Sequence, residues 1–165
     1  MKLEDSVRYS NALSFASKLH ASQQRKDKTP YILHPIKVSM ILAKKGFDVR
    51  YQIAGLFHDL LEDTVATEDD LKEFCDEEML TAVRLVTKVQ GQSEMDYINN
   101  ILGQPMAKEI KNADRIDNLS DLNTSKEVKF KERYLRQTEL FFVGKFSPEL
   151  DELYYKIMNS CVHDI

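Results

Sequence analysis

The stretch Ala54–Val65, AGLFHDLLEDTV, places four ionisable side chains in a mostly apolar run: His58, Asp59, Glu62 and Asp63. A buried carboxylate or imidazolium without a partner is costly, because an apolar interior cannot replace the water that it loses. These groups therefore either line a cleft or satisfy one another. On a helix, side chains three and four residues apart share a face, so all four can border one cavity.

Size and charge limit the class of protein. The chain has 165 residues, 42% of them hydrophobic and 30% charged, which suits one compact domain. Its start, MKLEDSVRYS, lacks the apolar core of a signal peptide, and no run approaches the ~18 apolar residues of a membrane span, so we expect a cytoplasmic protein without a membrane partner. A formal net charge of -4 argues against broad binding to nucleic acid, but a small anionic ligand on a local cationic patch remains compatible with it.

Apolar residues recur at helical spacing nearly throughout, and no stretch shows strand-like alternation. Pro35 is expected at the first position of a helix that ends at Gly46. The next helix, 49–61, is apolar around most of its circumference and is expected to be central. Thr67 and Asp70 resemble a capping box that opens a short acidic helix. Further helices are expected over residues 6–22, 79–89, 94–102, 105–122, 129–143 and 148–161. One all-α domain is the simplest account.

Two histidines and two aspartates are candidate ligands for a metal ion. His58 and Asp59 offer a neutral nitrogen and a carboxylate oxygen, and such mixed sets suit manganese, iron or zinc. His34 stands just before a helix start, and Asp114 lies in the helical stretch KNADRIDNL. A set of these four would leave positions open for water and substrate, as a catalytic site requires.

Each of these residues also has a structural interpretation. A lone His-Asp pair is common at helix edges, His34 could cap or pack against its helix, and Asp114 could pair with a neighbouring basic residue. Glu62 and Asp63 could be surface charge. Acids near a helix C-terminus oppose its dipole, however, and such local disfavour is often a mark of function.

Four segments, HASQQRKDKTPYILHPIKV, AGLFHDLLEDT, LVTKV and KNADRIDNLSDLN, occur here in the order and approximate spacing found in HD-superfamily hydrolases of the RelA/SpoT type. The chain resembles this family from His20 to Asn123, with a looser match through KERYLRQTELFF. Its members remove pyrophosphate from guanosine tetra- and pentaphosphate, the alarmones of the stringent response. The resemblance implies a single-domain, all-α HD-domain bundle over residues 1–165 with its metal-site core in 20–123. Since no segment is left for a synthetase domain, we expect a stand-alone small alarmone hydrolase similar to the metazoan SpoT homologue.

The resemblance also implies a role for each site residue. One divalent ion, with manganese expected and other transition metals open, would be bound by His34, His58, Asp59 and Asp114. Glu62 and Asp63 would orient and deprotonate the water on this ion or assist the leaving group. The implied substrate contacts are Arg25, Lys26, Lys88, Asn118 and Tyr134.

The substrate contacts have alternatives as well. Arg25 and Lys26 match the basic pair beside the nucleotide, where a guanidinium can stack on a purine, but they could equally form a solvated basic loop. Lys88 could be a surface lysine and Tyr134 a core aromatic. Tyr31 either faces the site or belongs to the core.

The chain departs from the family around Asp114. Family members usually have Leu-Ala-Asp before the Arg, and often an Arg two residues after the Asn; here Asn112 and Ser120 take the Leu and second Arg positions. One cation near the phosphates is therefore missing, and Asp117 and Asp121 make this edge more acidic than the substrate favours.

The leading prediction is a metal-dependent (p)ppGpp 3′-diphosphatase that yields GDP or GTP. The alternatives are an HD-type nucleotidase or phosphatase acting on nucleoside monophosphates or NADPH, and a non-catalytic nucleotide-binding regulator. His20 and His163 are read as structural or surface residues, and Cys75 and Cys161 as reduced, partly buried thiols. The aromatic residues Phe141, Phe142, Phe146, Tyr154 and Tyr155 are read as core or as a dimer surface, which leaves a homo-oligomer open.

Overall fold

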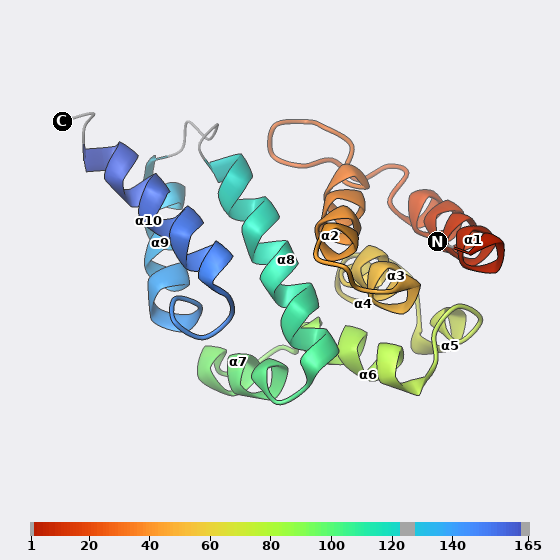
Figure 1. The fold of residues 1–165 in the computed structure, drawn as a ribbon. Coiled ribbons are helices and arrows are strands. Elements are labelled where there is room, and N and C mark those ends of the chain that lie inside the picture. Colours follow the sequence, from red (N-terminus) through yellow and green to blue (C-terminus); the bar gives the residue numbers. More distant parts are fainter. Residues whose placement is uncertain (1, 123–127, 163–165) are drawn as a thin grey trace. The chain divides into compact units, whose positions relative to one another are not determined.

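The computed structural model describes residues 2–122 and 128–162, with side chains through Ser160. Within these ranges the regular elements are all helices, and the only extended pairing is an isolated bridge between Gln24 and Pro30 (Figure 1). The predicted all-α fold is confirmed. No helix in the described part of the chain is both long and apolar enough to cross a bilayer. Asn123, His163 and the side chain of Cys161 lie outside the described residues.

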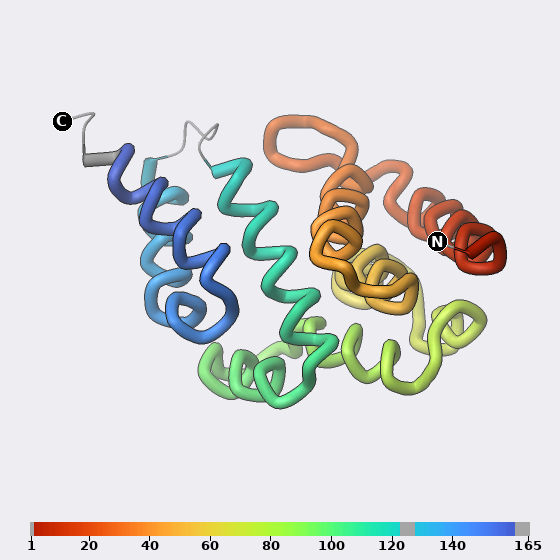
Figure 2. Tube along the Cα trace, in the orientation of Figure 1, coloured from red at the N-terminus to blue at the C-terminus, as the bar shows by residue number. Residues whose placement is uncertain are grey.

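Packing divides the chain into two compact units, residues 1–113 and 114–165, and each is described by itself. The domain boundaries expected from sequence, 1–165, stay a prediction. The first unit holds α1 (Leu3–Leu19), α2 (Leu33–Lys44), α3 (Val49–Phe57), α4 (Leu60–Asp63), α5 (Glu68–Leu71), α6 (Glu77–Val86), α7 (Glu94–Leu102) and the start of α8 (Pro105–Leu122). The second holds the rest of α8, α9 (Val128–Phe141) and α10 (Pro148–Val162), and Figure 2 traces this order along the chain.

Helix α3 is the centre of the first unit and packs on α1, α2 and α6. Its side chains Ile53, Leu56 and Phe57 are fully buried, as expected for a helix surrounded by others. The Asp48 carboxylate caps its start by accepting hydrogen bonds from backbone N–H groups of the first turn. The prediction that this helix is central is confirmed.

Gly55 brings α2 and α3 close together. A Cβ at this position would lie 2.7 Å from Leu42 Cδ1 and 3.5 Å from Val38 Cγ1, and both of these side chains are fully buried. The shorter distance is well inside van der Waals contact, so a larger residue would press on α2. Since α2 carries His34 and α3 leads into His58, this contact sets the spacing of the elements that hold the two histidines.

The helix is interrupted at His58 and Asp59, where one continuous helix over 49–61 was predicted. His58 keeps helical angles, but Asp59 turns to φ -103° and ψ -4°. His58 Nδ1 donates a hydrogen bond to the Gly55 carbonyl at 2.8 Å. This bond occupies a carbonyl that the next helical turn would otherwise use. The prediction of one continuous helix over 49–61 is therefore wrong.

Two predicted helix starts can be compared with the structure. Helix α2 begins at Leu33, so Pro35 is its third residue and not its first. Pro35 still lies in the first turn, where no intrahelical N–H bond is needed. The Asp70 carboxylate accepts from the Thr67 N–H at 2.8 Å and the Thr67 hydroxyl oxygen accepts in return from the Asp70 N–H, so the predicted capping box is confirmed.

The second unit contains a buried cation, Arg115, which is 5% exposed. Its guanidinium carbon lies 4.3 Å from the centroid of the Tyr134 ring and 3.9 Å from that of Phe142, so the charge is stabilised by two aromatic faces. Phe142, Phe146 and Tyr154 are buried, in agreement with the core interpretation of the aromatic set.

Candidate metal centre

Three of the four predicted ligands lie together in the first unit. His34 comes from the first turn of α2, and His58 and Asp59 form the turn between α3 and α4. One ligand atom of each lies within 4.8 Å of the other two. The imidazoles are 3% and 2% exposed, whereas the Asp59 side chain keeps 21%. The cluster is therefore buried on its histidine side and open beside its carboxylate.

Asp59 Oδ2 is the shared point of the cluster, 2.9 Å from His58 Nε2 and 3.7 Å from His34 Nε2. Because His58 Nδ1 donates to a carbonyl, Nε2 of the neutral ring carries a lone pair. A lone pair and a carboxylate oxygen at this distance repel each other unless a proton or a cation lies between them. Neighbouring ligand atoms around an ion with bonds of about 2.1 Å are about 3–3.5 Å apart. The donor set therefore fits a divalent cation.

Tyr31 makes a further polar contact with Asp59. Its hydroxyl donates to Asp59 Oδ2 at 2.6 Å. Burial, followed by the negative charges of Asp59 and Asp63, raises the pKa of Tyr31 above its ordinary range, so the phenol stays protonated and remains a donor. The sequence left Tyr31 open between site and core, and the structure places it at the site.

Glu62 and Asp63, the predicted catalytic acids, are exposed on the short helix α4. Glu62 Oε2 accepts from the backbone N–H of Lys88 at 3.0 Å, and Asp63 Oδ2 accepts from Gln23 Nε2 at 3.3 Å. Each carboxylate is thus oriented by a donor from elsewhere in the unit while it stays in contact with water. This combination suits a group that exchanges protons.

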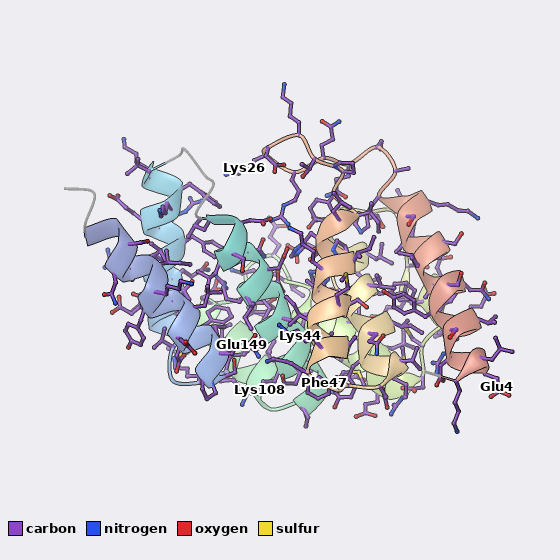
Figure 3. All side chains as sticks on the ribbon, turned by 45° about the horizontal axis from the view of Figure 1, so that its top comes forward. Glu4, Lys26, Lys44, Phe47, Lys108 and Glu149 are labelled. Atoms are coloured by element: carbon purple, nitrogen blue, oxygen red, sulfur yellow. The ribbon has the colours of Figure 1, made fainter. Side chains whose placement is uncertain are left out.

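The loop between α1 and α2 is an ordered turn that carries the predicted basic pair, Arg25 and Lys26. The Arg25 N–H donates to the Thr29 carbonyl at 2.9 Å, and Lys28 at the tip takes φ 69°. The Asp27 carboxylate accepts from the Thr29 hydroxyl at 2.7 Å. Figure 3 shows Lys26 on this loop. The contact of the basic pair with a nucleotide stays a prediction.

Lys88, predicted to meet the substrate, is already engaged within the first unit. Its ammonium pairs with Glu94 and lies 5.7 Å from the centroid of the Tyr97 ring. Its backbone N–H binds Glu62, as described above. A phosphate contact stays a prediction, and the ammonium, with its three N–H donors, would share it with Glu94 or exchange one for the other.

Asp114, Asn118 and Tyr134 belong to the second unit. Asp114 is buried and accepts from Asn118 Nδ2, one turn later on α8, at 2.5 Å. The shared helix face predicted for these two residues is therefore present. Tyr134 lies against the Arg115 guanidinium, which is the contact of a core aromatic. The roles of all three toward metal and substrate stay predictions.

Two residues near the site were not assigned to it from sequence. His20 is buried at 1% exposure, and its Nδ1 lies 2.7 Å from Gln23 Oε1, while the other end of the Gln23 amide reaches Asp63. The spacing of His20 and Gln23 at the end of a helix is the only sequence signal for this contact. It does not specify where the following loop folds back.

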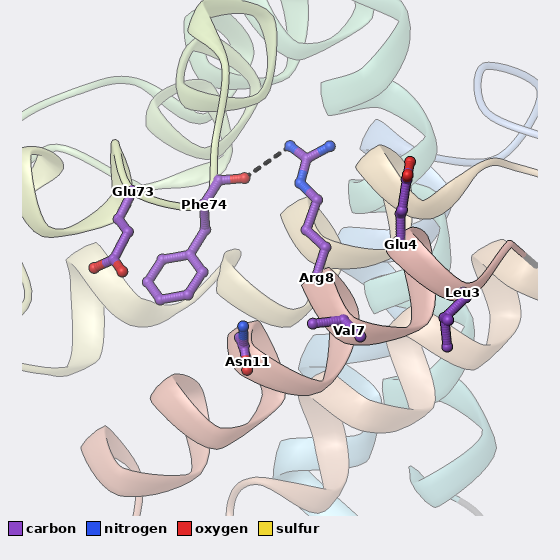
Figure 4. A pocket seen from close by; sticks show the side chains of 7 residues that line it. All are labelled: Leu3, Glu4, Val7, Arg8, Asn11, Glu73 and Phe74. Carbon is purple, nitrogen blue, oxygen red and sulfur yellow. Dashed lines mark hydrogen bonds between the residues drawn. The ribbon is translucent and has the colours of Figure 1, made fainter.

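A separate pocket of about 500 Å³ lies beside α1 (Figure 4). Its walls come from the first half of α1 and from Glu73 and Phe74 after α5, and the Arg8 guanidinium donates to the Phe74 carbonyl at 2.8 Å. None of the clustered histidines and aspartates lines it. The metal centre is thus independent of this hollow.

The chain matches the family model described as HD domain over residues 12–141. A guanosine-3′,5′-bis(diphosphate) 3′-pyrophosphohydrolase of Borreliella burgdorferi is 52% identical over 79 residues, which cover 47% of this chain and 12% of that protein. The Drosophila melanogaster guanosine-3′,5′-bis(diphosphate) 3′-pyrophosphohydrolase MESH1 is 34% identical over 129 residues, which cover 73% of this chain and 72% of that one.

A solved structure, described as a metazoan ortholog of SpoT that hydrolyzes ppGpp and plays a role in starvation responses, matches with a TM-score of 0.78 and 26% identity. The match covers 93% of this chain and 95% of that one. The chain thus spans a small part of the Borreliella protein but most of the length of the Drosophila and metazoan proteins.

Proposed function

The chain belongs to the HD-domain family, and we propose that it is a metal-dependent hydrolase that releases pyrophosphate from the 3′ position of ppGpp or pppGpp. The observation that carries this proposal is the convergence of the His34 and His58 Nε2 atoms on one oxygen of Asp59. The name of MESH1, of which the chain spans 72%, supports the choice of substrate. Action in the cytoplasm is part of the proposal, since the substrate is a nucleotide.

The proposed cofactor is one Mn²⁺ ion, held by His34, His58 and Asp59 together with Asp114. Imidazole nitrogens and carboxylate oxygens in one set suit manganese, iron or zinc. Such a cation, when bound, lowers the pKa of water and stabilises negative charge on phosphoryl oxygens. The Gly55 carbonyl prepares His58 for this role, because it holds the Nδ1–H and leaves Nε2 to bind.

Glu62 and Asp63 move protons in the proposed reaction. A water oxygen attacks the phosphorus attached to the 3′ oxygen, the bond between this phosphorus and the 3′ oxygen breaks, and pyrophosphate is released. One of the two carboxylates takes a proton from the attacking water, and a proton is delivered to the departing 3′ oxygen. The hydrogen bonds from Lys88 and Gln23 orient the two carboxylates for this exchange.

The proposed substrate contacts begin with Arg25 and Lys26 on the loop before α2. The Arg25 guanidinium can stack on the guanine while the Lys26 ammonium neutralises phosphate. Lys88 would add a third positive charge, and the resemblance of the motifs adds Asn118 and Tyr134 to the proposed contacts. We propose these contacts because the motifs that carry them resemble those of the family and occur in the same order along the chain.

The experiment that tests this function is a product analysis. Protein loaded with Mn²⁺ and incubated with ppGpp should give equal amounts of GDP and pyrophosphate, and an Asp59→Asn protein prepared in the same way controls for contaminating hydrolases. Unchanged ppGpp would reject the proposed function. Phosphate release from NADPH or nucleoside monophosphates would instead indicate a nucleotidase, and tight ppGpp binding without cleavage a regulator.

A further inference from the structure

One hydroxyl group fixes the orientation of the carboxylate at the centre of the cluster. Asp59 Oδ2 accepts from Tyr31 at 2.6 Å and faces the histidine nitrogens at 2.9 and 3.7 Å. Asp59 stands in the turn between two helices, where neighbouring turns of helix do not restrict its side chain. A short hydrogen bond to a carboxylate is among the strong ones, so it can select a single rotamer.

The Tyr31 ring is itself held on two sides. Its centroid lies 4.9 Å from that of His20, with the planes tilted by 36°, and 6.0 Å from that of His34, with the planes at 76°. The Tyr31 N–H also donates to the Gln23 carbonyl at 3.0 Å. The ring cannot turn away from Asp59 without disturbing these contacts.

A pair of side chains, His20 and Gln23, braces the same loop. Asp63 only accepts, so the Gln23 amide nitrogen must face it at 3.3 Å, and the Gln23 side-chain oxygen must therefore face His20. It follows that His20 Nδ1 carries a proton and donates it to Gln23 at 2.7 Å. Because His20 is buried, this bond ties the start of the loop to the body of the first unit.

We propose that Tyr31 is a positioning residue for the metal ion: its hydroxyl holds Asp59 in the rotamer that binds, and the His20–Gln23 pair keeps the tyrosine in place. This inference rests on the metal site of the proposed function and adds to it a residue that hydrogen-bonds to one of the ligands. Hydrogen-bond partners of metal ligands set their geometry, and the loss of one typically costs about 10–100-fold in metal affinity.

The test is a titration of metal-stripped protein with MnCl₂ by calorimetry. Tyr31→Phe keeps the ring but removes the hydroxyl, and its dissociation constant for Mn²⁺ should rise about 10–100-fold. Tyr9→Phe is the matched control, because Tyr9 belongs to the same unit and pairs its hydroxyl at 3.0 Å with Ser39, which is not one of the proposed ligands. Its dissociation constant should equal that of the wild type. Thermal unfolding of the stripped proteins verifies that both variants fold.

Three results would overturn the inference: equal Mn²⁺ affinity in wild type and Tyr31→Phe, an equal loss in Tyr9→Phe, or no binding of Mn²⁺ by the wild type. The last result would also remove the proposed metal site. A wild type that binds Mn²⁺ but leaves ppGpp intact would refute the proposed substrate alone. The comparison of Tyr31 with Tyr9 would then still decide the inference, since it measures metal binding and not turnover.

Discussion

Replacing Gly55 by alanine puts a methyl group into the contact between α2 and α3. The new Cβ would lie 2.7 Å from Leu42 Cδ1, and Leu42 is fully buried, so the leucine must adopt another rotamer in a packed core or α2 must shift. Overpacking of this kind costs about 1–3 kcal/mol. Alanine in a helix gains about 1 kcal/mol over glycine. We therefore expect a net destabilisation of about 0–2 kcal/mol.

A double-mutant cycle separates these two contributions. Leu42→Ala alone should cost about 2–5 kcal/mol because it leaves a cavity. In the double variant the clash is absent, so the two changes should couple favourably by about 1–3 kcal/mol. Urea unfolding of the four proteins in EDTA measures this without interference from bound metal. Additive effects within about 0.5 kcal/mol, or a Gly55→Ala protein that is about 1 kcal/mol more stable than wild type, would refute the close approach of the two helices.

Further predictions concern the ligands, the acids and the core. Asp59→Ala should abolish measurable Mn²⁺ binding in calorimetry, whereas Glu62→Gln should retain it and lower kcat for ppGpp by about 10²–10⁴-fold in a product assay; retention of full activity by both variants would show that the roles are wrong. The hydrogen bond from Arg50 holds the pKa of Asp76 below its ordinary 3.8. The stability that ionised Asp76 contributes is thus present above pH 3.8 and is lost as the pH falls through its lower folded-state pKa. In urea unfolding from pH 6 to 2.5, Asp76→Asn should therefore lose less free energy of unfolding with acid than the wild type does. Burial raises the pKa of the Cys75 thiol to about 12. In a variant that lacks the second cysteine, Cys75 should therefore react with a thiol reagent at pH 8 only when urea is added, and rapid labelling of the native protein would contradict its burial.

Local pattern was sufficient to predict much of the helical fold. The apolar circumference of 49–61 predicted a central helix, and the pair Thr67 and Asp70 predicted a cap, because both signals depend on residues close in sequence. The interruption at His58 and Asp59 was not predictable in this way. Both residues tolerate a helix, and the bend accompanies a bond from the imidazole to a backbone carbonyl that periodicity does not report.

The candidate site likewise contains residues that the sequence predicted and a contact that it did not. His34, His58 and Asp59 were proposed as ligands from their chemistry and from the resemblance of their motifs, and the structure brings these three together. The contact of Tyr31 with Asp59 depends on how the loop after α1 folds back, and that path requires the positive φ of Lys28. A lysine does not indicate a left-handed conformation, so the sequence could not decide whether Tyr31 faces the site or belongs to the core.

The loop between α1 and α2 holds the predicted nucleotide-binding pair, Arg25 and Lys26, a few residues ahead of Tyr31, on one short turn with its own internal hydrogen bonds. Because this turn connects the basic pair to Tyr31, a nucleotide that restrains one end also restrains the other. In the proposed function, nucleotide binding and ion binding are therefore expected to be thermodynamically linked. Linkage of this kind is reciprocal: whatever factor the ion contributes to nucleotide affinity, the nucleotide returns to the ion. In the proposed function, the ion would then be bound more tightly by molecules that already hold the nucleotide.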